Sequence, residues 1–180
     1  VGMDVDSKVV AGLRAGVAHF VDVGFDTALR EALNSGQLQL MDTMSYEPDI
    51  FICAVGTPVV EAQLDSRAID ELITSFCSVE HLRGKLIVFR SSLPPGFCRA
   101  ALKKMASATG LIPAVAFDVV YAPERSVEGG AYEELSSLPQ LIGFSGELGA
   151  LASREIIPTI FKSVVDLESL EAAELAKLSC

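Results

Sequence analysis

Short apolar runs alternate with segments of helical spacing along the whole chain, and this alternation predicts an α/β fold with a mostly parallel sheet. Buried strands are predicted where β-branched, aromatic and other apolar residues cluster, at 49–55, 85–89 and 117–121. Less continuous strand patterns occupy 1–5, 37–42, 140–144 and 164–167. Helical spacing predicts helices near 7–17, 26–35, 65–76, 132–135 and 147–161, one that begins at Pro95 or Gly96, and one from 170 to the chain end.

Local signals define the ends and the environment of several elements. Ser7 is the expected N-cap of the first helix, whose apolar face includes Val10 and Val17. Ser169 is the expected N-cap of the last helix. The nearly continuous apolar run at 49–55 is typical of a central parallel strand that is covered on both faces.

Polar residues follow the three buried strands directly. Residues 56–58 (Gly-Thr-Pro) and 90–92 (Arg-Ser-Ser) end two of them, and Glu124, Arg125 and Glu128 follow the third. Open α/β sheets bind ligands beyond the carboxyl ends of their strands, so these segments are candidate binding elements. The alternative for each segment is a solvated loop or an ordinary turn between a strand and a helix.

Two further charged residues have both a functional and a structural interpretation. Asp4 ends the first predicted strand, where an acidic residue of a dinucleotide-binding fold accepts hydrogen bonds from the ribose of NAD and repels the 2′-phosphate of NADP. Alternatively, Asp4 or Asp6 is a carboxylate that stabilises the start of a helix. Lys177 near the end of the last helix is a candidate site residue or a solvated charge that the helix dipole favours.

Composition limits the possible partners. Half of the 180 residues are hydrophobic, which indicates a well-buried protein, and the net charge of −10 argues against nucleic acid and anionic membranes as partners. No apolar run reaches the length of a membrane span. An anionic substrate therefore needs a local basic site.

The cysteines argue against a metal site. They stand at 53, 77, 98 and 180, without CxxC spacing and without a histidine nearby. Free thiols fit a reducing compartment, and we expect a cytoplasmic location.

Six segments, taken in order, resemble the nucleotide-sugar dehydrogenases, which oxidise UDP-sugars at C6 with NAD. They are GMDVDSKVVAGLRAG (2–16), FICAVGTPV (51–59), GKLIVFRSSLPPG (84–96), YAPERSVEGGAYEEL (121–135), LPQLIGFSG (138–146) and LEAAELAKLSC (170–180). The YxPER form at 121–125 resembles the branch that acts on UDP-N-acetylhexosamines such as UDP-N-acetyl-D-mannosamine. UDP-glucose dehydrogenases carry PEFLxEG at this place.

The resemblance implies a Rossmann-like, doubly wound, mostly parallel sheet that binds NAD. No GxGxxG occurs, and the chain starts at the strand that corresponds to the second of such a domain, so the first strand and the Gly-rich loop are missing from this sequence. Residues 1–168 are then the NAD-binding domain, and residues 169–180 begin the central helical region on which the family's homodimers rest. The implied process is polysaccharide biosynthesis.

The resemblance also implies roles for individual residues. Catalytic roles fall on Glu124, Glu128 and Lys177. Cofactor binding falls on Asp4, Thr57 and Ser92. Substrate binding falls on Arg125, Ser126 and Lys177. Ser92 replaces a threonine of the family pattern, and Arg90 stands where the family usually has a glutamate.

The implied chemistry is two successive hydride transfers. The C6 alcohol becomes an aldehyde, a cysteine captures the aldehyde as a thiohemiacetal, and a second oxidation gives a thioester that water hydrolyses to the uronic acid. In the family this cysteine lies well beyond the lysine helix, and Cys180 stands at the wrong place on that helix to replace it.

Three alternatives remain at this point. The Arg90 and Ser92 departures are compatible with a non-catalytic Rossmann-like module that binds a ligand or a partner. A second alternative is a UDP-glucose 6-dehydrogenase. A hydroxyacid dehydrogenase with a single oxidation is the third, but it gives no reason for YAPER and AELAK to occur together.

Overall fold

The chain forms two compact units, in a computed structural model that describes residues 1–42, 47–61, 63–77, 82–127 and 129–179. Unit 1 comprises Val1–Glu47 and Ser126–Ser137, and unit 2 comprises Pro48–Arg125 and Leu138–Cys180. Of the residues singled out in the sequence, Glu128 and Cys180 lie outside the described part of the chain.

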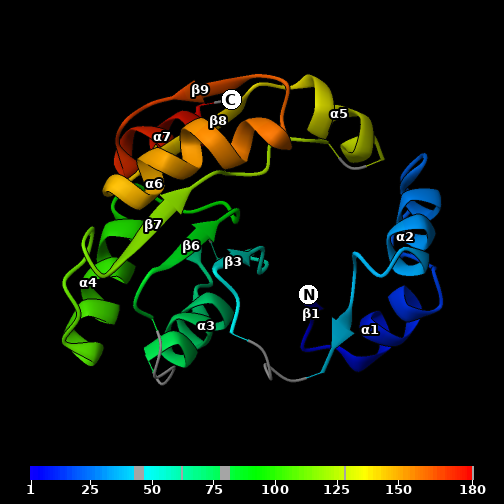
Figure 1. The fold of residues 1–180 in the computed structure, drawn as a ribbon, viewed down its shortest axis with the longest axis horizontal. Coiled ribbons are helices and arrows are strands. Elements are labelled where there is room, and N and C mark those ends of the chain that lie inside the picture. Colours follow the sequence, from blue (N-terminus) through cyan, green and yellow to red (C-terminus); the bar gives the residue numbers. More distant parts are fainter. Residues whose placement is uncertain (43–46, 62, 78–81, 128, 180) are drawn as a thin grey trace. The chain divides into compact units, whose positions relative to one another are not determined.

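Unit 1 is built from a pair of short strands and three helices (Figure 1). Strand β1 (Gly2–Met3) pairs in parallel with β2 (Leu40–Met41). The helices are α1 (Ser7–Arg14), α2 (Phe25–Asn34) and α5 (Ala131–Ser137). The Asp22 carboxylate joins α5 to the rest of the unit, because it accepts hydrogen bonds from the backbone amides of Ala131 at 2.7 Å and Tyr132 at 3.1 Å.

The start and end of α1 differ from the prediction. Asp6, not Ser7, is the N-cap, and its carboxylate accepts a hydrogen bond from the Lys8 amide at 2.8 Å. The helix ends at Arg14, and Gly16 adopts the left-handed conformation that commonly terminates helices. Val17 therefore lies beyond the helix and is 51% exposed instead of sharing its apolar face.

Unit 2 contains a five-stranded sheet in the order β3-β6-β7-β8-β9. The strands are β3 (Ile50–Cys53), β6 (Lys85–Phe89), β7 (Phe117–Tyr121), β8 (Gln140–Phe144) and β9 (Val164–Asp166). All neighbouring pairs are parallel except β7 and β8, which are antiparallel. The predicted α/β class with a mostly parallel sheet is confirmed.

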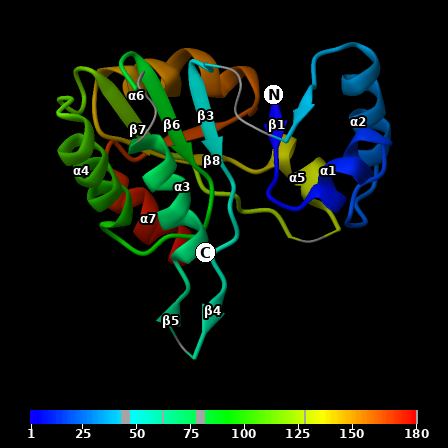
Figure 2. The same cartoon turned by 90° about the horizontal axis from the view of Figure 1, so that it is seen from below.

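Helices cover both faces of this sheet. The helices α3 (Arg67–Cys77), α4 (Phe97–Thr109) and α7 (Leu170–Leu178) lie on one face, and α6 (Glu147–Leu151) lies on the other (Figures 1 and 2). The alternation along β7 explains both layers: Phe117, Val119 and Tyr121 belong to the main hydrophobic core, and Asp118 between them accepts a hydrogen bond from the Gly149 amide of α6. None of the helices in the described segments is long and apolar enough to span a membrane.

The helix predicted at 147–161 is divided. After α6 the chain continues as a π-helical turn, Ala152–Ile156, and a 3₁₀ turn, Ile157–Thr159. Pro158 lies in the last turn, where it lacks the amide hydrogen that a continuing α-helix needs.

Strand β3 is not covered as the sequence predicts. Within unit 2 it is one of the two edge strands of the sheet and pairs with β6, and Ile52 is 62% exposed. An apolar run shows that a strand can be buried, but it does not show which neighbours cover it.

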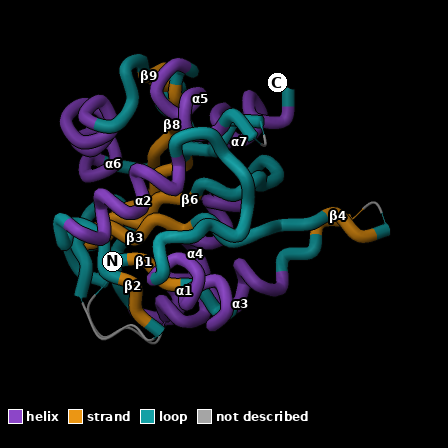
Figure 3. The backbone as a smooth tube through the Cα atoms, turned by 90° about the vertical axis from the view of Figure 1, so that its right-hand side faces the viewer, coloured by secondary structure: helices purple, strands orange, loops and turns teal. Residues whose placement is uncertain are grey.

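A short hairpin after β3 was not predicted. Strand β4 (Val59–Val60) pairs in an antiparallel manner with β5 (Gln63–Leu64). The hairpin extends away from the rest of unit 2 in Figures 2 and 3, and Val59 and Val60 are 70% and 55% exposed. Strands of two residues are too short for an alternating pattern to be recognised.

The described cysteines of unit 2 form no disulfide, and two of them are deeply buried. Cys53, Cys77 and Cys98 are free cysteines. Burial raises the pKa of the Cys53 thiol to about 12 and that of Cys98 well above its usual range. Thiols that stay protonated are weak nucleophiles, so Cys53 and Cys98 act as core residues.

Helix α7 is fastened to α4 by an ion pair. Arg99 donates from Nε to Oε1 of Glu171 at 2.8 Å and from Nη2 to Oε2 at 3.0 Å. Ser169 is the N-cap of α7, as predicted. Gly143 of β8 allows the start of α7 to lie close to β8, because a Cβ atom at residue 143 would clash with the carbonyl oxygen of Ser169. The hydrogen bond from Arg99 lowers the pKa of Glu171 to about 2.

This pair predicts a loss of stability in acid. The folded-state pKa of about 2 lies below the ordinary value of 4.5, so the unfolded chain binds more protons between these two pH values. The contribution of the pair is complete above pH 4.5 and is lost as pH falls towards 2. Because both side chains are about 40% exposed, we expect it to be about 1 kcal/mol or less.

Urea unfolding of the wild type and Glu171→Gln at pH 7 and pH 3 measures this contribution. The wild type should be the more stable protein at pH 7, and the difference should narrow at pH 3. A difference of equal size at both pH values would contradict the assignment.

Candidate functional site

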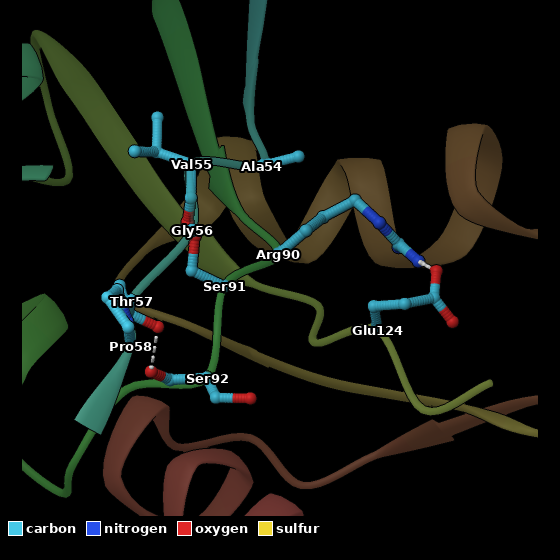
Figure 4. A pocket seen from close by; sticks show the side chains of 9 residues that line it. All are labelled: Ala54, Val55, Gly56, Thr57, Pro58, Arg90, Ser91, Ser92 and Glu124. Atoms are coloured by element: carbon cyan, nitrogen blue, oxygen red, sulfur yellow. Dashed lines mark hydrogen bonds and ion pairs between the residues drawn. The ribbon is translucent and has the colours of Figure 1, made fainter. Parts of the chain in front are cut away.

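A cavity of about 630 Å³ lies at the carboxyl ends of β3, β6 and β7, within unit 2. Residues 54–58, residues 90–92 and Glu124 line it (Figure 4). The structure thus brings together three of the predicted site residues, Thr57, Ser92 and Glu124. The edge of the sheet is also the place where ligands bind in this class of fold.

Two hydrogen bonds join the loops that follow β3 and β6. Thr57 Oγ1 donates to the carbonyl oxygen of Ser92 at 2.9 Å, and Ser91 Oγ donates to that of Val55 at 2.6 Å. The Ser92 hydroxyl is exposed and makes no hydrogen bond to a residue that the structure describes. A Cβ atom on Gly56 would meet no heavy atom within 4 Å. The cavity therefore presents a bare backbone turn and an available hydroxyl, which suits close approach of a polar cofactor.

The segment between Ser91 and α4 is held from two sides. The Tyr121 hydroxyl donates to the carbonyl oxygen of Ser91 at 3.1 Å and accepts from the Leu93 amide at 3.3 Å. The fully buried Glu174 of α7 accepts hydrogen bonds from the amides of Gly96 at 2.5 Å and Cys98 at 2.7 Å. A carboxylate from another helix thus caps α4, which has no cap from its own side chains.

Glu124 is held by both of its carboxylate oxygens. Oε2 forms a short ion pair with Nη2 of Arg90, and Oε1 accepts a hydrogen bond from the Arg125 amide at 2.8 Å. Its own amide donates to the carbonyl oxygen of Arg90 at 3.0 Å. The side chain is 41% exposed, so a ligand in the cavity can still reach the carboxylate.

Arg90 and Gln140 are site residues to which sequence reasoning gave no role. Nη1 of Arg90 donates to the carbonyl oxygen of Ala122 and to Oε1 of Gln140, both at 3.1 Å. The buried Gln140 in turn donates to the carbonyl oxygen of Pro123 at 3.0 Å. The only signal in the sequence was the departure of Arg90 from the family pattern.

Arg125 and Ser126 follow Glu124 but are not among the described residues that line the cavity. Nη1 of Arg125 donates to the carbonyl oxygen of Pro139 at 2.9 Å. Its Nε atom is buried and has no hydrogen-bond partner in the described part of the chain. Ser126 begins the second segment of unit 1.

Lys177 and Asp4 are not among the described residues that line the cavity. Lys177 is half-buried in the last turn of α7, and its side chain makes no ion pair or hydrogen bond with any described residue. Asp4 follows β1 in unit 1, and its Oδ1 atom accepts a hydrogen bond from the Asp6 amide at 2.8 Å. Asp6 provides the carboxylate at the start of α1, so the helix-start alternative applies to Asp6.

The cap on α4 predicts a large cost for shortening Glu174. Glu174→Ala leaves the amides of Gly96 and Cys98 without their acceptors, and we expect a loss of about 3 kcal/mol in the free energy of unfolding. Glu174→Gln retains one acceptor oxygen and should lose less. Denaturant unfolding measures both, and a Glu174→Ala variant as stable as the wild type would rule out the capping role.

Comparison with known proteins agrees with this architecture. Residues 1–165 match the NAD binding domain of the UDP-glucose/GDP-mannose dehydrogenase family. The chain is 30% identical over 180 residues to a UDP-N-acetyl-D-mannosamine dehydrogenase of Pyrococcus horikoshii, a match that covers 99% of this chain and 43% of that protein.

Solved structures lead to the same group of proteins. A UDP-D-ManNAc dehydrogenase from Pyrococcus horikoshii has a TM-score of 0.91 at 29% identity, over 98% of this chain and 43% of that one. A UDP-glucose dehydrogenase from Pyrobaculum islandicum has a TM-score of 0.82 at 28% identity, over 99% and 42%. This chain thus spans less than half the length of the relatives that it matches. Because the family match extends from residue 1 to residue 165, the chain belongs to the UDP-glucose/GDP-mannose dehydrogenase family and represents its NAD-binding domain.

Proposed function

We propose that this chain is the cofactor-binding part of an enzyme that oxidises a UDP-N-acetylhexosamine, UDP-N-acetyl-D-mannosamine, at C6 to the uronic acid. The observation that carries the proposal is the cavity, whose lining combines the Glu124 carboxylate with the Thr57 and Ser92 hydroxyls in a chain of this family. The name of the Pyrococcus horikoshii relative supports the choice of sugar. The YAPER form of residues 121–125 supports the same branch.

NAD, when bound, would supply the acceptor for one hydride in each of the two oxidations, so each sugar consumes two NAD molecules. The residues at the strand ends fit such a ligand: Gly56 leaves its backbone bare, and the Thr57 and Ser92 hydroxyls can hydrogen-bond polar groups. Asp4, at the end of β1, is assigned to the adenosine ribose because its carboxylate can accept hydrogen bonds from two adjacent hydroxyls.

Glu124 is assigned to proton transfer. Oxidation of the C6 alcohol removes a hydride from carbon and a proton from oxygen, and hydrolysis of the thioester requires a water molecule to lose a proton as it attacks. A carboxylate within hydrogen-bond reach serves both steps. The 41% exposure of the Glu124 side chain supports this role, since its carboxylate is accessible to a ligand.

Lys177 and Arg125 are assigned to binding negatively charged groups of the substrate. An ammonium group stabilises an alkoxide or a tetrahedral oxyanion, and Lys177 has no ion pair with a described residue that would neutralise it. Arg125 is assigned to substrate binding by the family resemblance, and its guanidinium is a donor of the kind that binds anionic groups. Ser126 is assigned to substrate contact and Glu128 to catalysis by the family resemblance alone.

The captured aldehyde needs a nucleophilic thiol, which this chain's core cysteines do not provide. Cys53 and Cys98 are buried with raised pKa values. By the family resemblance the thiol belongs to a region beyond α7. The same resemblance assigns residues 1–168 to the NAD-binding domain and 169–180 to the start of a central region that forms homodimers. A cytoplasmic location and a role in polysaccharide biosynthesis complete the proposal.

The proposal predicts two equivalents of NADH for each sugar oxidised. The assay uses the full-length natural protein with NAD and UDP-N-acetyl-D-mannosamine, and it follows the absorbance of NADH. We expect Glu124→Gln to lower kcat by about 10²–10⁴-fold. Lys177→Ala should lower it by about 10²–10³-fold.

Several results would contradict this proposal. Wild-type rates in both variants would remove the site assignment. Faster turnover of UDP-glucose than of UDP-N-acetyl-D-mannosamine would assign the protein to the UDP-glucose 6-dehydrogenases, as the relative from Pyrobaculum islandicum is named. Absence of NAD binding in calorimetry, with binding of another ligand, would indicate a non-catalytic module.

A second prediction concerns cofactor choice. Asp4→Ser removes the carboxylate that repels a 2′-phosphate, so the preference for NAD over NADP in kcat/KM should fall by at least about tenfold, or 1.4 kcal/mol. Asp6→Ser in the same unit is the matched control, since Asp6 caps α1. An unchanged preference in Asp4→Ser, or an equal change in both variants, would overturn the assignment of Asp4.

A further inference from the structure

Arg90 is the buried partner of the Glu124 carboxylate. The Arg90 side chain is 14% exposed, against 41% for Glu124. A guanidinium stays protonated in proteins, so a charge buried to this degree needs a counter-charge. Glu124 provides it on one side and lines the cavity on the other. Figure 4 shows the two side chains meeting at the end of the Arg90 side chain.

Arg90 also fixes the backbone that carries Glu124. Its carbonyl oxygen accepts a hydrogen bond from the Glu124 amide at 3.0 Å, and Nη1 donates to the carbonyl oxygen of Ala122 at 3.1 Å. Gln140 completes the arrangement, because it accepts from Nη1 and donates to the carbonyl oxygen of Pro123. Residues 122–124 are thus each bound by Arg90 or by a residue that Arg90 contacts.

The plane of the guanidinium is itself constrained. Its central carbon lies 5.4 Å from the centroid of the Phe161 ring, within the range of a cation–π contact. Three acceptors on two nitrogen atoms and one aromatic ring require the flat, forked shape of arginine. A lysine ammonium carries the charge but cannot reproduce this set of contacts.

We propose that Arg90 is a positioning residue, which acts on the reaction by fixing the Glu124 carboxylate at the edge of the cavity. This inference rests on the proposed function and adds to it a residue whose type departs from the family pattern. The Arg90 side chain acts through Glu124, so its effect on catalysis should depend on the presence of that carboxylate.

Kinetics of Arg90→Met and Arg90→Lys test the proposal in the protein as natively encoded, with NAD and UDP-N-acetyl-D-mannosamine. Arg90→Met should lower kcat by about 100-fold, because small displacements of a catalytic group have effects of this size. The KM for NAD should stay within about twofold, and Arg90→Lys should lose about tenfold in kcat. Arg67→Met is the control, since Arg67 forms an exposed ion pair with Asp65 elsewhere in unit 2.

The double variant separates positioning from an independent role. In the Glu124→Gln background, Arg90→Met should lower kcat by no more than about threefold further. If kcat of the double variant is reduced by the product of the two single-variant reductions, the two residues act independently and the proposal is overturned. If Arg90→Lys and Arg90→Met both retain the kcat of the wild type, the positioning role of Arg90 is also overturned. The proposed function would still stand in that case, because the wild-type protein turns over the substrate.

Hydrogen exchange gives a readout that needs no substrate and decides the inference even if the proposed activity is absent. The amides of Ala122, Glu124 and Arg125 should exchange faster in Arg90→Lys than in the wild type or in Arg67→Met, while the amides of α4 stay unchanged. If Arg90→Met does not fold, Arg90→Lys carries both measurements. Unchanged exchange of the Ala122, Glu124 and Arg125 amides would show that Arg90 does not hold this loop.

Discussion

Strand β7 is buried along its whole length, so each polar group that it carries must find a partner inside the protein. Asp118 meets this requirement on one face of the sheet by accepting from Ser145 Oγ and from the Gly149 amide, which fixes the start of α6. Tyr121 meets it on the other face through the backbone of the loop after β6. The hydrogen bonds that the polar groups of β7 need thus hold α6 on one face of the sheet and the loop that borders the cavity on the other.

The same requirement governs the charges at the strand ends. The mostly buried Arg90 has its counter-charge in Glu124, and the fully buried Glu174 accepts two backbone amides at the start of α4. These groups differ from exposed pairs such as Arg67 with Asp65, whose removal should change little. Glu124, proposed for catalysis, and Glu174, proposed for stability, thus each compensate buried polar or charged groups near the strand ends.

The sequence alone predicted the buried strands best, because burial requires apolar residues along the strand. Strands 85–89 and 117–121 have the predicted bounds, because their continuous apolar runs admit few alternatives. The less continuous pattern at 140–144 also has its predicted bounds. The cap of α1 was misassigned, since Asp6 and Ser7 are adjacent and both residue types cap helices well. The hairpin at Val59–Val60 was missed because its strands are too short to show a period.

The partners in the site were beyond sequence reasoning for another reason. The strand-end rule located Thr57, Ser92 and Glu124 together, because parallel strands bring their carboxyl ends to one edge. The rule does not say which side chains meet there: Arg90 lies 34 positions from Glu124 and 50 from Gln140. Only the tertiary structure shows that these side chains meet.

The cap that Glu174 places on α4 connects α7 to the loop that precedes α4. Helix α7 carries this carboxylate, and the amides that it binds terminate the loop that carries Ser92. Moving α7 away would break two buried hydrogen bonds, so α7 and this loop should shift together or not at all. Lys177 and Ser92, which we propose bind the sugar nucleotide and the cofactor, would then keep a fixed separation that the protein sets before either ligand arrives.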